Sequence, residues 1–261
     1  MSERILVGGS PGTGKTYQWL TIARAFPNVT FHVIDPDDGV SRLVETEFSE
    51  LTNLDYYFTP VWYSKPKANP SGFGKVGGIA DSFAEIRKAV KPGDWLIIEM
   101  LGNIWSMAQT AFVTEVFDQG IGEYFLNARK SMKEGAKRLE ALKGWTDWQV
   151  INKMHNDDFL VPACYQVGCH VYMTSSVSVS APTEVAGEDA EVRSFYGDSL
   201  IRFDGQKQNP FRAQSIFLFR KDRKGQWRYS TFIKDRGRQF IEDEELYDFG
   251  VQYVMGIAGI E

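Results

Sequence analysis

Near the start of the chain the sequence reads Gly9-Ser10-Pro11-Gly12-Thr13-Gly14-Lys15-Thr16 (GSPGTGKT). Glycines at these positions let backbone N–H groups close around phosphate oxygens, while the Lys15 ammonium reaches the outer phosphates of a triphosphate. The Thr16 hydroxyl is placed to ligate magnesium. The spacing therefore predicts a phosphate-binding loop, or P-loop, that binds ATP with Mg²⁺ and is followed directly by Tyr17.

The segments on either side of the loop support this interpretation. Residues 5–7 are apolar and β-prone, and residues 16–26 place apolar side chains at helical spacing. A helix that starts at the loop adds the positive end of its dipole to the phosphate site. A second β-rich run at 29–34 ends in the turn sequence DPDDG at residues 35–39, which predicts a βαβ unit.

Hydrolysis requires a carboxylate near the metal and a group that orients water. The short apolar run 95–98 predicts a buried parallel strand, and Glu99 follows it directly. We expect Glu99 to be the carboxylate on the metal side, with an ordinary acid at a strand end as the alternative. Asp37 and Asp38 follow the second strand, so either carboxylate is a candidate for orienting water at the same sheet edge.

The rest of the chain predicts one α/β domain over residues 1–261, with a central, mostly parallel sheet. Residues 102–160 are expected to form a helical insertion with a basic stretch at 129–143, and residues 170–173 a further strand. Residues 199–240 predict antiparallel strands that include a hairpin, and residues 241–261 an acidic tail.

The order of these motifs resembles the RecA-like ATPase core, most of all the compact phage-encoded ATPases of AAA type. The matching elements are the P-loop, VIDPDDG, WLIIEM and YMTSS. The resemblance implies that Asp37, or else Asp38, activates water, and that Thr174 or Ser175 senses the γ-phosphate. The chain departs from the family in having Glu99 where an aspartate is expected, and no separate polymerisation segment precedes the first strand.

RecA-like enzymes commonly place a basic residue of one subunit against the nucleotide of the next, where it stabilises charge on the transferred phosphoryl group. The resemblance therefore implies a homo-oligomer. Two Lys-Asp-Arg triplets provide the candidates, which are Lys221, Arg223, Lys234 and Arg236. The alternative is a solvated hairpin whose charges pair internally with Asp222 and Asp235.

Composition limits the partners. The formal charge of −5 argues against a protein that coats nucleic acid with its whole surface. No apolar run approaches the length of a membrane span, and the first strand leaves no room for a secretory signal, so we expect a cytoplasmic protein, in the host cytoplasm if the chain is phage-encoded. Cys164 and Cys169, separated by four residues, are expected to be buried, reduced thiols rather than metal ligands.

A local nucleic-acid site remains compatible with this charge. Between Arg212 and Arg238 nine basic residues face two acids, and aromatic residues lie between them. Single-stranded DNA could contact this hairpin region, the 65–75 loop or the basic helical stretch. The alternative is a hairpin with one buried and one solvated face.

Three functions are compatible with these features. The first is a DNA-linked RecA-like ATPase that acts in recombination, replication or repair. The second is a small-molecule kinase, which the scarcity of arginine between Arg42 and Arg129 disfavours. The third is a nucleotide-regulated assembly or remodelling ATPase whose helical insertion engages a protein partner. Stimulation of hydrolysis by DNA, phosphate transfer to an acceptor, and ATP-dependent assembly without DNA distinguish them.

Overall fold

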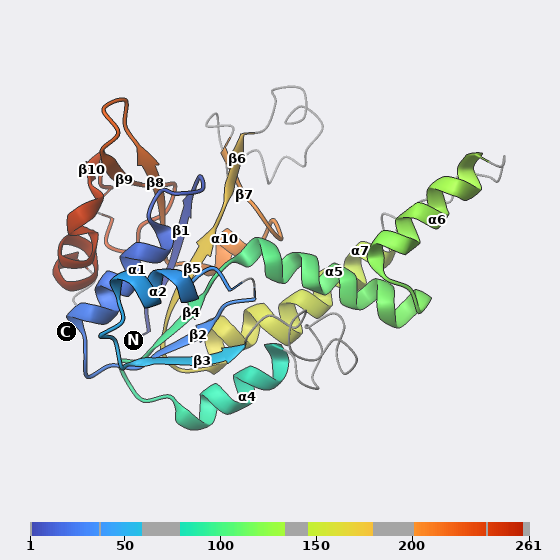
Figure 1. Cartoon of the computed structure of the whole chain (residues 1–261), viewed down its shortest axis with the longest axis horizontal. Helices are drawn as coiled ribbons and strands as arrows, with labels where there is room; N and C mark the ends of the chain where they lie inside the picture. Colours follow the sequence, from blue (N-terminus) through green and yellow to red (C-terminus); the bar gives the residue numbers. More distant parts are fainter. Residues whose placement is uncertain are drawn as a thin grey trace.

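The computed structural model describes residues 2–36, 38–58, 79–133, 146–179, 201–238 and 240–257. Its centre is an eight-stranded sheet in the order β10-β9-β8-β1-β5-β4-β2-β3 (Figure 1). The parallel strands are β1 (Arg4–Gly9), β2 (Phe31–Ile34), β3 (Leu54–Phe58), β4 (Trp95–Ile98), β5 (His170–Ser175) and β8 (Ser215–Lys221). The predicted α/β class with a mostly parallel sheet is confirmed.

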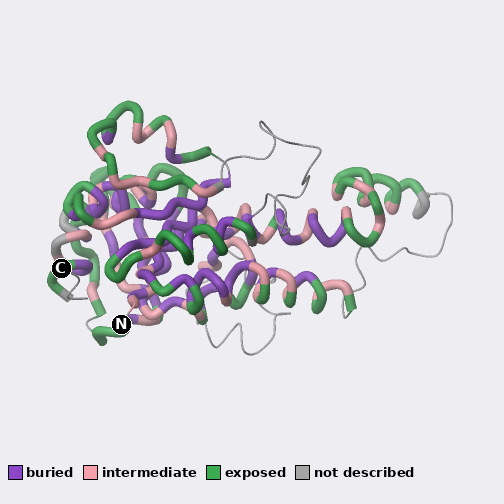
Figure 2. The backbone as a smooth tube through the Cα atoms, turned by 90° about the horizontal axis from the view of Figure 1, so that it is seen from below, coloured by how far each residue is buried: buried purple, intermediate pink, exposed green. Residues whose placement is uncertain are grey.

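Both faces of the sheet are covered, which explains why its central strands are apolar without alternation. On one face Ile5 and Val7 pack with α1 (Lys15–Ala25) and with η5 (Gly250–Ile257). On the other face Leu6 packs with α4 (Ile79–Ala89), α5 (Leu101–Phe117) and α7 (Thr146–His155). Figure 2 shows the buried residues concentrated in this layered part of the molecule.

The helical segment forms an arm that leaves the sheet. α5 runs outward from the end of β4, and α6 (Ile121–Lys133) lies at its far end (Figure 1). α7 returns toward the sheet and continues through π-helical turns at Asn156–Leu160 and Pro162–Gln166. Helices were expected here, although residues 134–145 of the basic stretch lie outside the described residues, as does the 65–75 loop.

The carboxy-terminal part adds an antiparallel edge to the parallel sheet. β8 pairs in parallel with β1 and antiparallel with β9 (Trp227–Thr231), as the predicted hairpin requires. β10 (Glu244–Glu245) extends this edge. β7 (Ile201–Phe203) instead joins β6 (Val177–Val179) in a separate two-stranded sheet. The short helices α2 (Ser41–Glu47) and α10 (Asn209–Arg212) complete the described helices that bear on the sites below.

The segment expected to be an acidic tail has four of its six acidic residues at 242–245. η4 (Leu246–Asp248) and η5 follow β10, and Leu246, Phe249 and Tyr253 are buried in the same core as α1. The acids at 242–245 dominate the composition of the segment, whereas the apolar residues after them decide its packing. Across the described residues, no helix combines the length and apolarity that a bilayer crossing requires.

Candidate nucleotide-binding site

The predicted P-loop connects the end of β1 to the start of α1. Gly12 and Gly14 have φ angles of 73° and 89°, a left-handed backbone that favours glycine. Gly14 is also the N-cap of α1 and has no side chain to bond the first-turn amides. Those amides have no partners within the helix. The loop therefore presents backbone donors and a helix N-terminus on one side of a cavity, as an anion site requires.

Lys15 lies in the floor of this cavity and is 8% exposed. Its Nζ donates to the carbonyl oxygens of Gly9 at 2.8 Å and Ser10 at 3.1 Å. Burial lowers the pKa of Lys15, whereas the charges of Glu99 and Asp204 oppose that shift. The ammonium is thus held by loop carbonyls, with the charges of two carboxylates acting on it, at the position where the motif predicts contact with phosphate.

Glu99 follows β4 and meets the P-loop helix directly. The Thr16 hydroxyl donates to its Oε1 at 2.9 Å, and the Trp19 indole donates to its Oε2 at 3.1 Å. The side chain is 5% exposed, and burial raises its pKa against the opposing effects of these bonds, of Thr174 and of the Lys15 charge. The carboxylate is therefore next to the hydroxyl that the motif assigns to the metal.

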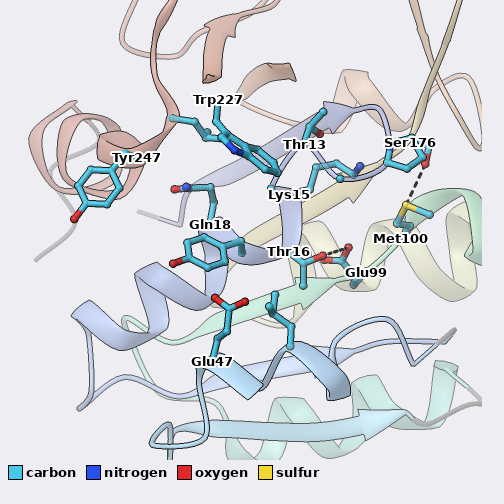
Figure 3. A pocket seen from close by; sticks show the side chains of 16 residues that line it. Thr13, Lys15, Thr16, Gln18, Glu47, Glu99, Met100, Ser176, Trp227 and Tyr247 are labelled. Atoms are coloured by element: carbon cyan, nitrogen blue, oxygen red, sulfur yellow. Dashed lines mark hydrogen bonds between the residues drawn. The ribbon is translucent and has the colours of Figure 1, made fainter. Parts of the chain in front are cut away.

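The cavity has a volume of about 670 Å³ and has a polar side and an aromatic side (Figure 3). The P-loop and Glu99 form the polar side. Trp227 from the start of β9, Tyr17 from α1, and Leu246 and Tyr247 from η4 form the aromatic and apolar part of the lining. A Cβ at Gly14 would lie 3.1 Å from the Trp227 ring, so this indole packs directly against the loop.

Of the two acids expected to orient water, the structure describes one, and it does not line the cavity. Asp37 lies outside the described residues. Asp38 is exposed, accepts a hydrogen bond from Ser41 and is absent from the residues that line the cavity. The neighbouring Asp35 is buried and accepts the amides of Gly39 at 3.2 Å and Val40 at 3.0 Å. These bonds fix the turn that leads into α2.

The polar end of β5 lies between the P-loop strand and β4 in the sheet. Thr174 is buried, and its hydroxyl donates to the Ile98 carbonyl at 3.4 Å. Ser175 is also buried and donates to the carbonyl oxygens of Ser176 at 2.8 Å and Asp204 at 2.9 Å. The next residue, Ser176, lines the cavity. Thus Thr174 and Ser175, the two candidates for γ-phosphate sensing, are buried behind Ser176 and do not line the cavity themselves.

The two Lys-Asp-Arg triplets lie at opposite ends of the sheet. Lys221 ends β8 on the P-loop side, and its Nζ is 4.3 Å from the centre of the Trp227 ring. Arg223 lies in the exposed turn between β8 and β9. Lys234 and Arg236 follow β9, at the other end. A role for these last two at a nucleotide would therefore require a second copy of the chain.

Sequence and fold comparisons add little beyond this geometry. No protein-family model and no curated protein matches the sequence. Among solved structures, the chain is similar to the crystal structure of the RadB recombinase, with 13% sequence identity and a TM-score of 0.47. The alignment covers 92% of this chain and 84% of that one. We draw no functional conclusion from a likeness at this level.

Sequence reasoning missed several residues of the site. Glu47 from α2 and Ser176 line the cavity, and Asp204 acts on the Lys15 charge from the turn after β7. Glu47 and Asp204 belong to no recognisable motif. Ser176 ends the YMTSS run, but the resemblance points to Thr174 or Ser175 in that run. Trp227 is one of the aromatic residues between Arg212 and Arg238 for which the sequence suggests contact with DNA. The structure places it beside the P-loop.

The cysteines lie away from this site. Cys164 and Cys169 are free and buried, as expected, and burial raises the pKa of each thiol to about 12. Within the described ranges, no three His, Cys, Asp or Glu side chains form a group that could hold a metal ion. A metal at the P-loop would therefore depend on Thr16, Glu99 and the oxygens of a bound phosphate.

Proposed function

We propose that this chain binds ATP with Mg²⁺ in the P-loop cavity and hydrolyses it. One observation carries the proposal. Lys15, Thr16 and Glu99 line the same cavity, next to a glycine-rich loop that leads into α1. Lys15 compensates phosphate charge, and the loop amides orient the phosphate chain. A glycine turn without ligand function requires neither a buried lysine nor a buried carboxylate.

The donor set fits magnesium. Thr16 and Glu99 offer a hydroxyl and a carboxylate 2.9 Å apart, and Mg²⁺ prefers oxygen ligands that it shares with phosphates. When bound, Mg²⁺ neutralises charge on the phosphate oxygens. Glu99 is a buried carboxylate with a raised pKa, so a nearby cation would favour its ionised form. Glu99 would hold the metal in position either directly or through water.

The aromatic side of the cavity fits a nucleobase. Trp227 and Tyr17 offer ring faces or edges, and stacking of a base on an aromatic side chain contributes about 1–3 kcal/mol. The Gln18 side-chain oxygen is buried and has no hydrogen-bond partner within the described residues. Because the exocyclic amine of adenine is a donor, an amide oxygen in this wall favours adenine over a base that offers only acceptors there.

Isothermal titration with ATP tests the proposal. Wild-type protein should bind ATP more tightly with Mg²⁺ than with EDTA, and should release phosphate. Lys15→Ala should lose productive binding, whereas Lys130→Ala on the distant α6 should behave as wild type. A folded wild-type protein with no affinity for MgATP would overturn the proposal, as would a Lys15→Ala variant that hydrolyses ATP at the wild-type rate.

We further propose that hydrolysis is linked to DNA, as in a RecA-like ATPase of phage recombination, replication or repair. The motif order and the basic residues support this assignment. Phosphate release with and without oligo(dT) tests it, and equal rates would contradict it. A partner-remodelling ATPase is the second candidate, because α5 and α6 expose Val116, Phe125 and Leu126 along the arm. Assembly with a non-hydrolysable ATP analogue, without a response to DNA, would favour that candidate.

A further inference from the structure

Basic side chains gather at the end of the sheet opposite the P-loop. β1 begins at Arg4, and Arg212 lies shortly before β8, which runs parallel to β1. Lys234 follows β9, which runs antiparallel to β8, so it returns to the same end. Arg4, Arg212 and Lys234 are called the basic cluster below. β1 runs from Arg4 to Gly9, the first residue of the P-loop, over a length of roughly 17 Å.

Specific contacts hold these cations together. The Arg4 and Arg212 guanidinium carbons lie 4.8 Å and 5.8 Å from the centre of the same Tyr165 ring. Arg4 Nε donates to the Arg212 carbonyl at 2.9 Å, and Lys234 Nζ donates to the Phe211 carbonyl at 3.3 Å. Arrangement around one ring and bonding to backbone oxygens position the three charges without neutralising them.

The charges of the basic cluster are not compensated by carboxylates in the described part of the chain. None of its three members makes an ion pair there. Arg212 Nε is buried without a hydrogen-bond partner among the described residues. Burial lowers the pKa of Lys234, and the charge of Arg4 lowers it further. An anion placed among these groups would remove a repulsion that the folded protein otherwise tolerates.

The nearby acids are occupied elsewhere. Glu3 accepts Arg236 Nη1 at 2.7 Å. Asp235 accepts the Gly237 amide at 2.6 Å. The β8–β9 hairpin, which lies within the same predicted region at 212–238, differs in this respect, because Arg220 and Arg228 both contact the Asp243 carboxylate. Arg220 and Arg228 on the hairpin are therefore neutralised by carboxylates, whereas Arg212 and Lys234 make no ion pair within the described residues.

We propose that the basic cluster binds the phosphate backbone of single-stranded nucleic acid. The proposal deepens the DNA-linked function proposed above and moves its contact from the hairpin to the opposite sheet end. Exposed rings lie beside the charges, since Tyr165 is 50% and Phe211 42% exposed. Cations combined with accessible aromatic faces are typical of single-strand binding. Tyr165 positions the guanidinium groups, while the exposed part of the Phe211 ring offers a surface for a base.

Anisotropy of fluorescein-labelled oligo(dT), measured from 50 to 300 mM salt with and without MgATP, tests this site. The double variant Arg212→Gln/Lys234→Gln should bind on the order of tenfold more weakly at low salt. Its slope of log affinity against log salt should be smaller by about 1.4, because each single-strand phosphate contact contributes about 0.7. Phe211→Ala should weaken binding severalfold and leave the slope unchanged, since it removes no charge.

Arg220→Gln/Arg228→Gln is the matched control, because it also removes two positive charges but from the neutralised hairpin. Circular dichroism and the Tm check that each variant folds. Arg212→Lys keeps the positive charge that Arg212→Gln removes, so its salt slope should return to that of wild type. Equal affinities for wild type and Arg212→Gln/Lys234→Gln would overturn the proposal, as would an equal loss in the hairpin control or tighter binding of duplex DNA. Wild-type MgATP affinity, titrated separately, reports on the nucleotide site.

Discussion

The two ends of β1 carry basic residues in opposite electrostatic situations. At the carboxyl end Lys15 is buried, bonded to loop carbonyls and close to the carboxylates of Glu99 and Asp204. At the amino end Arg4 lies near Arg212 and Lys234, without a carboxylate partner in the described residues. The comparison teaches that a basic residue indicates a ligand only when its surroundings are known, because sequence alone does not show which charges are compensated.

Removing Lys15 should have the largest effect at the P-loop end. Lys15→Ala deletes the only charge that the motif aims at the outer phosphates, so phosphate release should fall by about 10²–10³-fold. Multiple-turnover hydrolysis with saturating MgATP measures the loss. If the variant retained more than a tenth of wild-type turnover, Lys15 would not be the phosphate-binding cation at the carboxyl end of β1.

The substitution Glu99→Gln should separate binding from turnover. It keeps the shape of the side chain but removes the charge beside Thr16, so hydrolysis should fall by about 10–100-fold while MgATP affinity changes much less. Burst kinetics and titration on one preparation measure both quantities. A loss of affinity as large as the loss of turnover would assign Glu99 to binding alone.

The same substitution should stabilise the nucleotide-free protein. Burial raises the folded-state pKa of Glu99 above its unfolded value, so the stability that this group contributes is full below the unfolded pKa and is lost as pH rises through the folded pKa. Gln undergoes no such loss. Glu99→Gln should therefore exceed wild type in Tm at pH 8, with a difference that shrinks as the pH falls toward 4.5. A difference that does not vary with pH would contradict this cause.

Sequence predicted those parts of the site whose positions are set locally. The P-loop is a continuous segment, and Glu99 follows a strand that is recognisable by its apolar run, so both were found. Glu47 and Asp204 reach the site through loop paths that residue spacing does not encode. The polar run after β5 was found, but spacing alone did not show that Ser176, rather than Thr174 or Ser175, lines the cavity. The buried η5 was missed because four acids precede it, and a composition average hid residues such as Phe249 and Tyr253.

Trp227 tests whether the aromatic wall of the cavity contacts the base. Trp227→Ala should weaken MgATP binding by about tenfold, since 1.4 kcal/mol lies within the range of one aromatic stack. Tripolyphosphate is the control ligand because it has the phosphates without the base, and its affinity should be unchanged. Equal losses for ATP and tripolyphosphate would indicate that the ring supports the loop at Gly14 rather than the base.

Substitution of Arg220 should have the smallest effect among these basic residues. Its guanidinium contacts Asp243 at an exposed site, and exposed ion pairs contribute about 0–1 kcal/mol. Arg220→Gln should therefore leave the Tm, MgATP affinity and oligo(dT) affinity close to wild type, although it removes the same charge as Arg212→Gln. A large loss of oligo(dT) binding in this variant alone would mean that Arg220 leaves Asp243 and pairs with a phosphate of the nucleic acid instead. The distinction between compensated and free cations would then fail at the hairpin.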